Sequence, residues 1–149
     1  MSTTLKIATF ALLTIATCAV SNSTTISPPE VIDAKLLEDI MADVNGHKVM
    51  LYSKTYCPYS KRLKKVLSKY DIDDMKVMEL DMDDNMRNLQ NTLKTISGRT
   101  TVPQLFIGGH FVGGHDESVQ LDNKGELKEM LDKAHALQTN RVPVNRNGL

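Results

Sequence analysis

The residue whose type and position most clearly suggest chemistry is Cys57. It stands in the run Thr55–Ser60, between a short apolar segment and a helical pattern. A thiol at the start of a helix faces unpaired backbone N–H groups and the positive end of the helix dipole. Both favour the thiolate, which is the nucleophilic form of cysteine. We therefore expect Cys57 to be a reactive nucleophile.

The cysteine count predicts chemistry with a single thiol. The position three residues after Cys57, where a dithiol redox motif carries its second cysteine, is Ser60. The other cysteine, Cys18, lies in an N-terminal apolar run, and its removal with that run would leave Cys57 without an intramolecular partner. In an oxidising compartment such a thiol reacts with small disulfides. An intermolecular structural disulfide is the alternative.

The N-terminus has the features of a targeting segment. Lys6 precedes the uncharged, mostly apolar run 7–20, which is shorter than the ~20 residues of a comfortable membrane span. Small residues at 19–21 predict cleavage by signal peptidase after Ser21. An uncleaved signal anchor is the alternative, and only this anchor implies membrane association. We expect the endoplasmic reticulum or Golgi lumen, or secretion.

Size and charge predict one domain without a nucleic-acid partner. The 149 residues carry 18 basic and 18 acidic side chains and no tryptophan, so neither a strong field nor a base-stacking platform is expected. One domain with tails fits this length. The expected division is a signal peptide or anchor over 1–21, a linker over 22–29, a domain over 30–137 and a disordered tail over 138–149.

Helical and strand periodicities alternate along the domain. The predicted elements are a helix over 30–44, a strand over 47–53, a helix over 58–70, a strand over 75–80, a helix from 83 to 97, strands over 104–107 and 110–112, and closing helical patterns whose last apolar face comprises Leu127, Met130, Leu131, Ala134 and Leu137. The glycine pair Gly108-Gly109 suits a two-residue hairpin.

This order of elements, α-β-α-β-α-β-β-α, predicts the fold class. The first βαβ unit is expected to be parallel and right-handed, whereas the two strands of the terminal hairpin are antiparallel. The sequence therefore predicts an α/β fold with a four-stranded mixed sheet flanked by helices on both faces.

Four motifs, in this order and at these separations, resemble the glutaredoxin family. They are Lys54 with Cys57-Pro58-Tyr59-Ser60, then Thr101-Val102-Pro103, then Gly113-Gly114, then His115-Asp116-Glu117. The resemblance covers about 30–137. It implies a thioredoxin-like fold and glutathione as co-substrate.

The resemblance implies roles for residues around the thiol. Lys54 would stabilise the thiolate and pair with the glycine carboxylate of glutathione, and Tyr59 would flank the glutathione groove. The run Thr101-Val102-Pro103 resembles the family's cis-proline loop. With a cis bond before Pro103, the N–H and C=O groups of Val102 would pair with the cysteinyl part of glutathione. The sequence leaves the isomer open.

Further roles are implied at the start of the last helical region. Gly114 would let the backbone approach a ligand, and the helix beginning at His115 would bind the γ-glutamyl carboxylate through backbone N–H groups. Asp116 would pair with the γ-glutamyl ammonium. His115 is expected beside the groove rather than on a metal, and both His115 and Glu117 depart from the family's usual residues. Arg99 resembles a basic position that meets the glycine carboxylate.

The resemblance implies an enzyme that reduces or forms protein–glutathione mixed disulfides through Cys57 by a monothiol route. Its partners would be glutathione and glutathionylated proteins, and it would be a monomer. The alternative is a homodimer that holds a [2Fe–2S] cluster through Cys57 of each subunit and two glutathione sulfurs. Pro58 and the lack of a Cys-Gly-Phe-Ser motif count against this alternative. Two groups of charged residues are interpreted as mostly solvated faces, although the basic group near the thiol could also lower the thiol pKa or steer anionic glutathione. The basic group is Lys61, Arg62, Lys64 and Lys65, and the acidic group is Asp71, Asp73, Asp74, Asp81, Asp83 and Asp84.

Overall fold

Four strands form one mixed sheet in the computed structural model, which describes residues 33–138. The expected signal segment and linker, and the tail beyond Gln138, lie outside the described residues. The sheet order is β2-β1-β3-β4; β1 and β2 are parallel, and β3 is antiparallel to both of its neighbours. The strands are β1 (Val49–Ser53), β2 (Met75–Glu79), β3 (Gln104–Ile107) and β4 (His110–Gly113).

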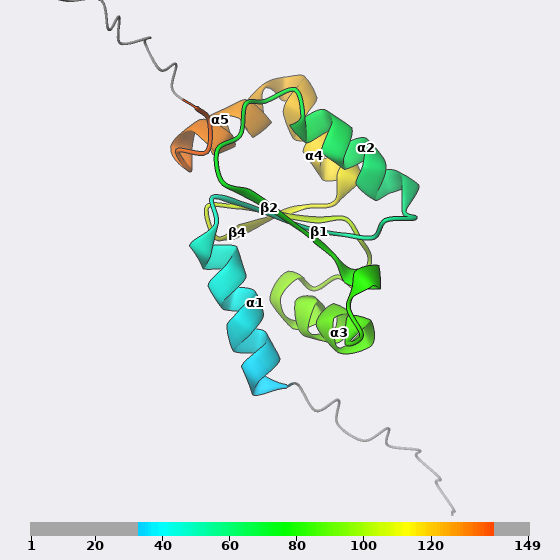
Figure 1. Cartoon of the computed structure of the whole chain (residues 1–149). Helices are drawn as coiled ribbons and strands as arrows, with labels where there is room; N and C mark the ends of the chain where they lie inside the picture. The colour runs from blue at the N-terminus through cyan, green and yellow to red at the C-terminus, as the bar shows by residue number, and fades with distance from the viewer. Residues whose placement is uncertain (1–32, 139–149) are drawn as a thin grey trace, which may run out of the picture. The chain divides into compact units, whose positions relative to one another are not determined.

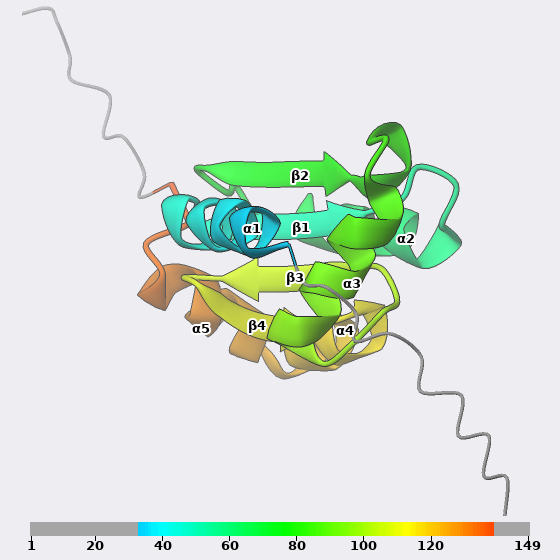
Figure 2. The ribbon, with the colours of Figure 1, turned by 90° about the horizontal axis from the view of Figure 1, so that it is seen from below.

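Helices cover both faces of this sheet, as the ribbon shows from two directions (Figures 1 and 2). The predicted α/β fold with a mixed sheet is therefore confirmed. On one face lie α1 (Ala34–Gly46) and α3 (Met86–Ser97); on the other lie α2 (Pro58–Leu67), α4 (His115–Lys124) and α5 (Glu126–Lys133), while a short 3₁₀ helix, η1 (Leu80–Met82), follows β2. No helix within residues 33–138 has the length and apolar character needed to cross a bilayer.

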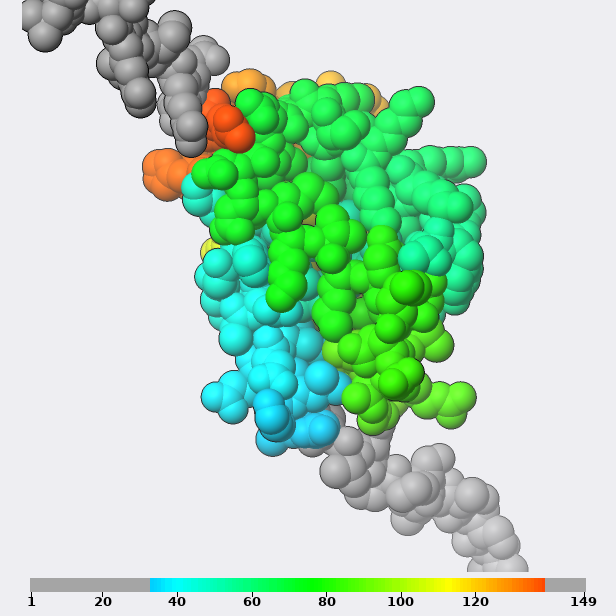
Figure 3. All heavy atoms as spheres, viewed as in Figure 1, coloured from blue at the N-terminus to red at the C-terminus, as the bar shows by residue number. Residues whose placement is uncertain are grey.

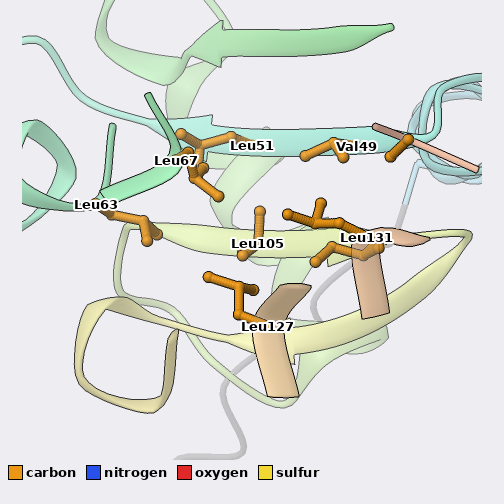
Figure 4. Packing of buried hydrophobic residues seen from close by; sticks show 9 residues of the cluster. Val49, Leu51, Leu63, Leu67, Leu105, Leu127 and Leu131 are labelled. Carbon is orange, nitrogen blue, oxygen red and sulfur yellow. The ribbon is translucent and has the colours of Figure 1, made fainter. Parts of the chain in front are cut away.

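Alternate residues of the strands form two separate cores, because successive side chains of a strand point to opposite faces. Every residue of β1 is buried, as expected for a central strand covered on both sides. One core packs Met50, Tyr52 and Phe106 against α1 and α3. The other packs strand residues against α2 and α5 and includes Val49, Leu51, Leu63, Leu67, Leu105, Leu127 and Leu131 (Figure 4).

The hairpin between β3 and β4 turns at Gly108-Gly109, as predicted. Both glycines have positive φ, 56° and 81°, which is the backbone of a type I′ turn. Ile107 pairs with His110 directly across the turn. The tight turn fixes the register of β4, and β4 leads straight into α4.

Charged side chains lie along β2, which is an edge strand of the sheet. In Figure 3 the green atoms of β2 lie at the surface between α1 and α2, and Val77 in the middle of the strand is 40% exposed. Lys76 of β2 pairs with Asp43 of α1 at 2.7 Å, and Glu79 pairs with Lys64 of α2. Lysines along an edge discourage pairing with a further strand. The ion pair of Lys64 was not predicted from the sequence.

The predicted start of the first helix was also wrong. The helix begins at Ala34 rather than at residue 30, because the carboxylate of Asp33 accepts the N–H groups of Lys35 and Leu36 at 3.1 and 3.3 Å and caps it there. The helix also runs two residues past its predicted end, to Gly46, and the following strand starts at 49 instead of 47.

Two other boundaries differ from the prediction. The helix after the thiol ends at Leu67 rather than at residue 70, and a turn follows it. The helix expected from residue 83 begins at Met86, with Asn85 as its N-cap, and residues 80–82 form η1. Its predicted end is confirmed, since Gly98 caps it in the left-handed conformation with φ 73°.

The closing helical region consists of two helices rather than one. Gly125, with φ 80°, separates α4 from α5. The second helix ends at Lys133, so Ala134 and Leu137 lie beyond it. Leu137 instead forms an isolated antiparallel bridge with Ile72, and it packs against the core from that position.

Candidate active site

Cys57 lies at the N-cap of α2, directly after the loop that leaves β1. Pro58 occupies the first helical position, where its missing N–H removes no hydrogen bond. The Cys57 N–H donates to the carbonyl of Lys54 at 3.1 Å, and the Cys57 carbonyl accepts the N–H of Lys61 at 3.1 Å. The strand, turn, thiol and helix predicted from the sequence are therefore present, and Cys57 is a free, partly buried thiol.

The surroundings of Cys57 favour its thiolate. Burial raises the pKa of the thiol, but hydrogen bonds from the Ser60 hydroxyl and from the backbone N–H groups of Ser60 and Tyr59, together with the charge of Lys54, lower the pKa by more. Ser60 is fully buried, and its hydroxyl also accepts the Lys54 N–H at 3.5 Å. The residue at the place of a second cysteine therefore holds the active-site turn and stabilises the sulfur.

A groove of about 320 Å³ lies beside the thiol. It brings together residues from α2, from the loop before β3 and from the start of α4, which are distant in sequence. All of the predicted site residues except Cys57 and Lys54 line it. The lining residues are Tyr59, Arg99, Thr101, Val102, Pro103, Gly114, His115, Asp116 and Glu117.

Val102 connects the groove to the thiol. Its carbonyl oxygen is 3.7 Å from the Cys57 sulfur, and the Val102–Pro103 peptide bond is cis. Two amide side chains hold the loop before it. Gln104 donates to the carbonyls of Arg99 and Thr101 at 2.9 and 3.1 Å, and Gln90 donates to the carbonyl of Thr100 at 2.8 Å. The sequence analysis assigned neither glutamine a role, because these contacts with the loop do not follow from a helix or strand pattern.

Lys54 is not part of the groove lining. Its ammonium donates to the Gln90 side chain at 3.0 Å and lies 6.0 Å from the centre of the Tyr56 ring. Lys54 therefore acts on Cys57 through its charge in this structure.

The glycine pair before α4 is required by close packing. Gly113 has φ 143°, and a Cβ placed there would lie 2.7 Å from the Cβ of Glu117. A Cβ on Gly114 would lie 3.2 Å from the carbonyl oxygen of Pro103. The lack of side chains at this pair therefore lets Glu117 and Pro103 pack closely, and Gly114 lines the groove.

The aromatic side of the groove is built around Tyr59, which is 50% exposed. Its ring meets the His115 ring edge-on, with the centroids 5.7 Å apart, and the Arg62 guanidinium lies 5.6 Å from its centre. The His115 ring also contacts the Asp116 carboxylate at 2.7 Å. Residues 33–138 contain no group of three or more His, Cys, Asp or Glu side chains arranged for a metal ion.

Glu117 is a groove residue that the sequence analysis did not include. One carboxylate oxygen accepts the Gly114 N–H at 3.0 Å, and the other pairs with the Arg99 guanidinium. The hydrogen bond from Arg99 lowers the pKa of Glu117 most, and the N–H groups of Glu117 and Gly114 lower it further. Burial raises this pKa by less, so the pKa is about 2. A glutamate at the third position of a helix is a known capping signal. The pairing with Arg99 has no such local signal.

Asp81 holds the loop that precedes the thiol, a role that the sequence analysis did not predict for a member of the acidic group. It accepts the Thr55 N–H at 2.8 Å and also the Thr55 hydroxyl. The pKa of Asp81 is lowered, most by the hydrogen bond from the Thr55 hydroxyl and further by the Thr55 N–H and the charge of Lys54. Burial alone would raise this pKa. Asp81 belongs to η1, so β2 positions the active-site turn through this contact.

Comparisons with known proteins agree with this geometry. The glutaredoxin family model matches residues 49–112. An uncharacterized monothiol glutaredoxin of Caenorhabditis elegans is 64% identical over 115 residues, which cover 76% of this chain and 79% of the relative. The chloroplastic monothiol glutaredoxin-S12 of Arabidopsis thaliana is 40% identical over 67% of this chain and 56% of its own length.

Solved structures have the same fold. The crystal structure of the buckwheat glutaredoxin–glutathione complex has a TM-score of 0.66 at 32% identity and covers 69% of this chain and 93% of its own. The crystal structure of oxidized glutaredoxin 2 from Chlamydomonas reinhardtii has a TM-score of 0.66 at 35% identity. The match covers 70% of this chain and 97% of that chain. The thioredoxin-like fold is thus confirmed, and the chain belongs to the glutaredoxin family.

Proposed function

We propose that this glutaredoxin is a glutathione-dependent thiol-disulfide oxidoreductase that acts on protein–glutathione mixed disulfides through Cys57 alone. The observation that carries the proposal is the position of the thiol. The pKa of Cys57 is lowered, and its sulfur lies 3.7 Å from the carbonyl oxygen of Val102, which lines the groove. The buried Ser60 stands where a second thiol would be.

The proposed cycle has two exchanges. The Cys57 thiolate attacks the glutathione sulfur of the mixed disulfide; the S–S bond breaks, the target leaves as a thiolate, and Cys57 carries glutathione. A second glutathione thiolate then attacks the glutathione sulfur on Cys57, which releases oxidised glutathione and regenerates the Cys57 thiolate. In total, the mixed disulfide and one free glutathione become the target thiol and oxidised glutathione, and no second protein thiol takes part. An oxidising compartment would reverse the cycle and glutathionylate the target.

The groove would determine which sulfur of the disulfide Cys57 attacks. The Val102 backbone would pair with the cysteinyl part of glutathione, and Tyr59 would cover one side of it. The N-terminal N–H groups of α4 would bind the γ-glutamyl carboxylate, with Asp116 against the γ-glutamyl ammonium. A fixed orientation places the glutathione sulfur in line with Cys57 and accounts for much of the rate.

The cellular setting of the proposal comes from the N-terminal sequence. The apolar run 7–20 and the small residues at 19–21 support entry into the secretory pathway, with the protein acting as a monomer in the endoplasmic reticulum or Golgi lumen or outside the cell. Its partners would be glutathione and glutathionylated proteins. These statements are independent of the groove chemistry.

The decisive experiment measures turnover of a glutathionylated peptide with glutathione and a reductase that recycles oxidised glutathione. We expect steady turnover by the wild type and none by Cys57→Ser. Turnover that persists in Cys57→Ser, or its absence from the wild type, would contradict the proposal.

The same preparations test the alternative of a cluster-binding homodimer. Cys57 offers one of the four thiolates that a [2Fe–2S] cluster requires, and residues 33–138 contain no other cysteine. The chain alone therefore does not fit the cluster, which would need a second copy and two glutathione sulfurs. Visible absorbance and a dimer on gel filtration, both dependent on glutathione and lost in Cys57→Ser, would favour this alternative.

A further inference from the structure

The Glu117 carboxylate occupies the groove as a ligand would. It is bound at once by a guanidinium and a backbone N–H, through Arg99 and Gly114, and all three residues line the groove. Proteins commonly hold the carboxylates of ligands with an arginine guanidinium and with backbone N–H groups at the start of a helix. The chain thus supplies a carboxylate to its own anion-binding groups.

The neighbouring acid provides a contrast. Asp116 also lines the groove, but its side chain is 78% exposed, and within residues 33–138 its one hydrogen-bond partner is the His115 ring. The Glu117 side chain is 40% exposed and reaches back over Gly113 to the Arg99 side chain, which is 43% exposed. Only one of the two acids is therefore placed to compete with a bound anion.

We propose that Glu117 is a specificity-determining residue that occupies the position of a glutathione carboxylate at Arg99 and so weakens glutathione binding. This inference rests on the proposed function, since it assumes that glutathione enters this groove. A glutathione carboxylate that reaches Arg99 must displace Glu117 or share the guanidinium with it. Either event opposes binding, because the pair breaks or two carboxylates approach each other.

The competition persists across the working pH range. Because the pKa of Glu117 lies near 2, the side chain stays ionised wherever the Cys57 thiolate is available. The carboxylate is also held by the Gly114 N–H, so it does not leave when Arg99 alone turns away. Removal of the negative charge, rather than a change of pH, is the way to release Arg99.

Glu117→Gln is the informative variant. The amide has nearly the same shape, and its oxygen can still accept the Gly114 N–H, so the start of α4 is preserved. Arg99 loses its charged partner and becomes available to a ligand. Glu126→Gln is the matched control, because Glu126 is an exposed residue at the first position of α5, outside the groove lining, and the substitution changes the charge equally.

Calorimetric titration with two unreactive probes, S-methylglutathione and its C-terminal glycine amide, tests the proposal. In Glu117→Gln we expect S-methylglutathione to bind about fivefold tighter than in the wild type, which is the size of effect that an exposed ion pair allows. Replacing the glycine carboxylate by the amide should weaken binding by less than about twofold in the wild type and by about fivefold in Glu117→Gln. The Glu126→Gln control should match the wild type.

The outcomes separate this inference from the proposed function. If the wild type binds the probe and turns over glutathionylated peptide, but Glu117→Gln binds no tighter or responds to amidation as the wild type does, the inference alone is overturned. Weaker binding by Glu117→Gln would also overturn it, and would show that Glu117 positions Arg99 for the ligand. If the wild type neither binds nor turns over, the proposed function fails and the inference with it. Glu117→Asp retains the charge, so it should not reproduce the gain of Glu117→Gln.

Discussion

Gly113 is the position where one added methyl group tests the packing behind the groove. In Gly113→Ala the new Cβ would lie 2.7 Å from the Glu117 Cβ and 3.1 Å from its Cγ. The backbone at this residue has φ 143°, a conformation that residues with a side chain rarely adopt. Both effects arise in the native state, so the variant should be less stable.

The expected loss follows from these two effects. Holding an alanine in this backbone conformation costs about 1–3 kcal/mol. Relieving the contact with Glu117 costs about a further 1–3 kcal/mol, as in other overpacked sites. The free energy of unfolding should therefore fall by about 2–6 kcal/mol, a large share of the ~5–15 kcal/mol that stabilises a typical domain.

Urea unfolding followed by far-ultraviolet circular dichroism measures this loss. With a slope of about 1–3 kcal/mol per molar, the midpoint should fall by about 1 M or more. Gly46→Ala is the matched control, because a Cβ there meets no atom within 4 Å and alanine is favoured in a helix, so its midpoint should hold or rise. A Gly113→Ala midpoint equal to that of the wild type would refute the account of this packing.

Three further predictions concern the thiol and its supports. In Ser60→Ala the pKa of Cys57 rises because the hydroxyl that lowers it is lost, so turnover should fall at neutral pH and recover at alkaline pH; an unshifted pH–rate profile would contradict this. In Asp81→Asn the charged acceptor of the Thr55 N–H and hydroxyl is lost, and we expect a several-fold lower kcat/KM at nearly unchanged stability. An unchanged kcat/KM would show that the contact between Asp81 and Thr55 does not contribute to activity. Since the pKa of Glu117 is lowered from 4.5 to about 2, its charge stabilises the fold above pH 4.5 and this part is lost as pH falls towards 2. Wild type and Glu117→Gln should therefore converge in stability over that range, and parallel curves would contradict the assignment.

The thiol and its immediate frame could be predicted because their determinants are local. Pro58 suits the first turn of a helix, the apolar run before the loop predicts a buried strand, and Gly108-Gly109 predicts a tight hairpin. These preferences act within a few residues of one another, and nothing in the tertiary structure opposes them. The mixed sheet followed from the same elements, through the parallel βαβ unit and the antiparallel hairpin, but the order of its strands was not predicted.

The remaining differences arise from interactions that the local sequence does not reveal. The first helix starts at an Asp33 cap rather than after the proline pair at 28–29. Leu137 fits the helical spacing of the closing region, yet in the structure it forms a bridge with Ile72, and several helices and strands separate the two residues in the sequence.

The groove shows the same limit more strongly. All of its lining residues except Glu117 were predicted from the family resemblance, and the structure brings them to one place. The role of Glu117 depends on Arg99, which arrives from the loop before β3. No spacing within the start of α4 predicts that contact, and the same holds for Asp81 and Thr55.

The most direct test of the central claim identifies what Cys57 carries after the first exchange. The protein is mixed with glutathionylated peptide in the absence of free glutathione, quenched with acid, and analysed by intact mass and peptide mapping. The account predicts one glutathione disulfide-bonded to Cys57 and release of the peptide as a free thiol. Cys57 joined to the peptide, with glutathione released, would contradict a groove that directs the attack to the glutathione sulfur.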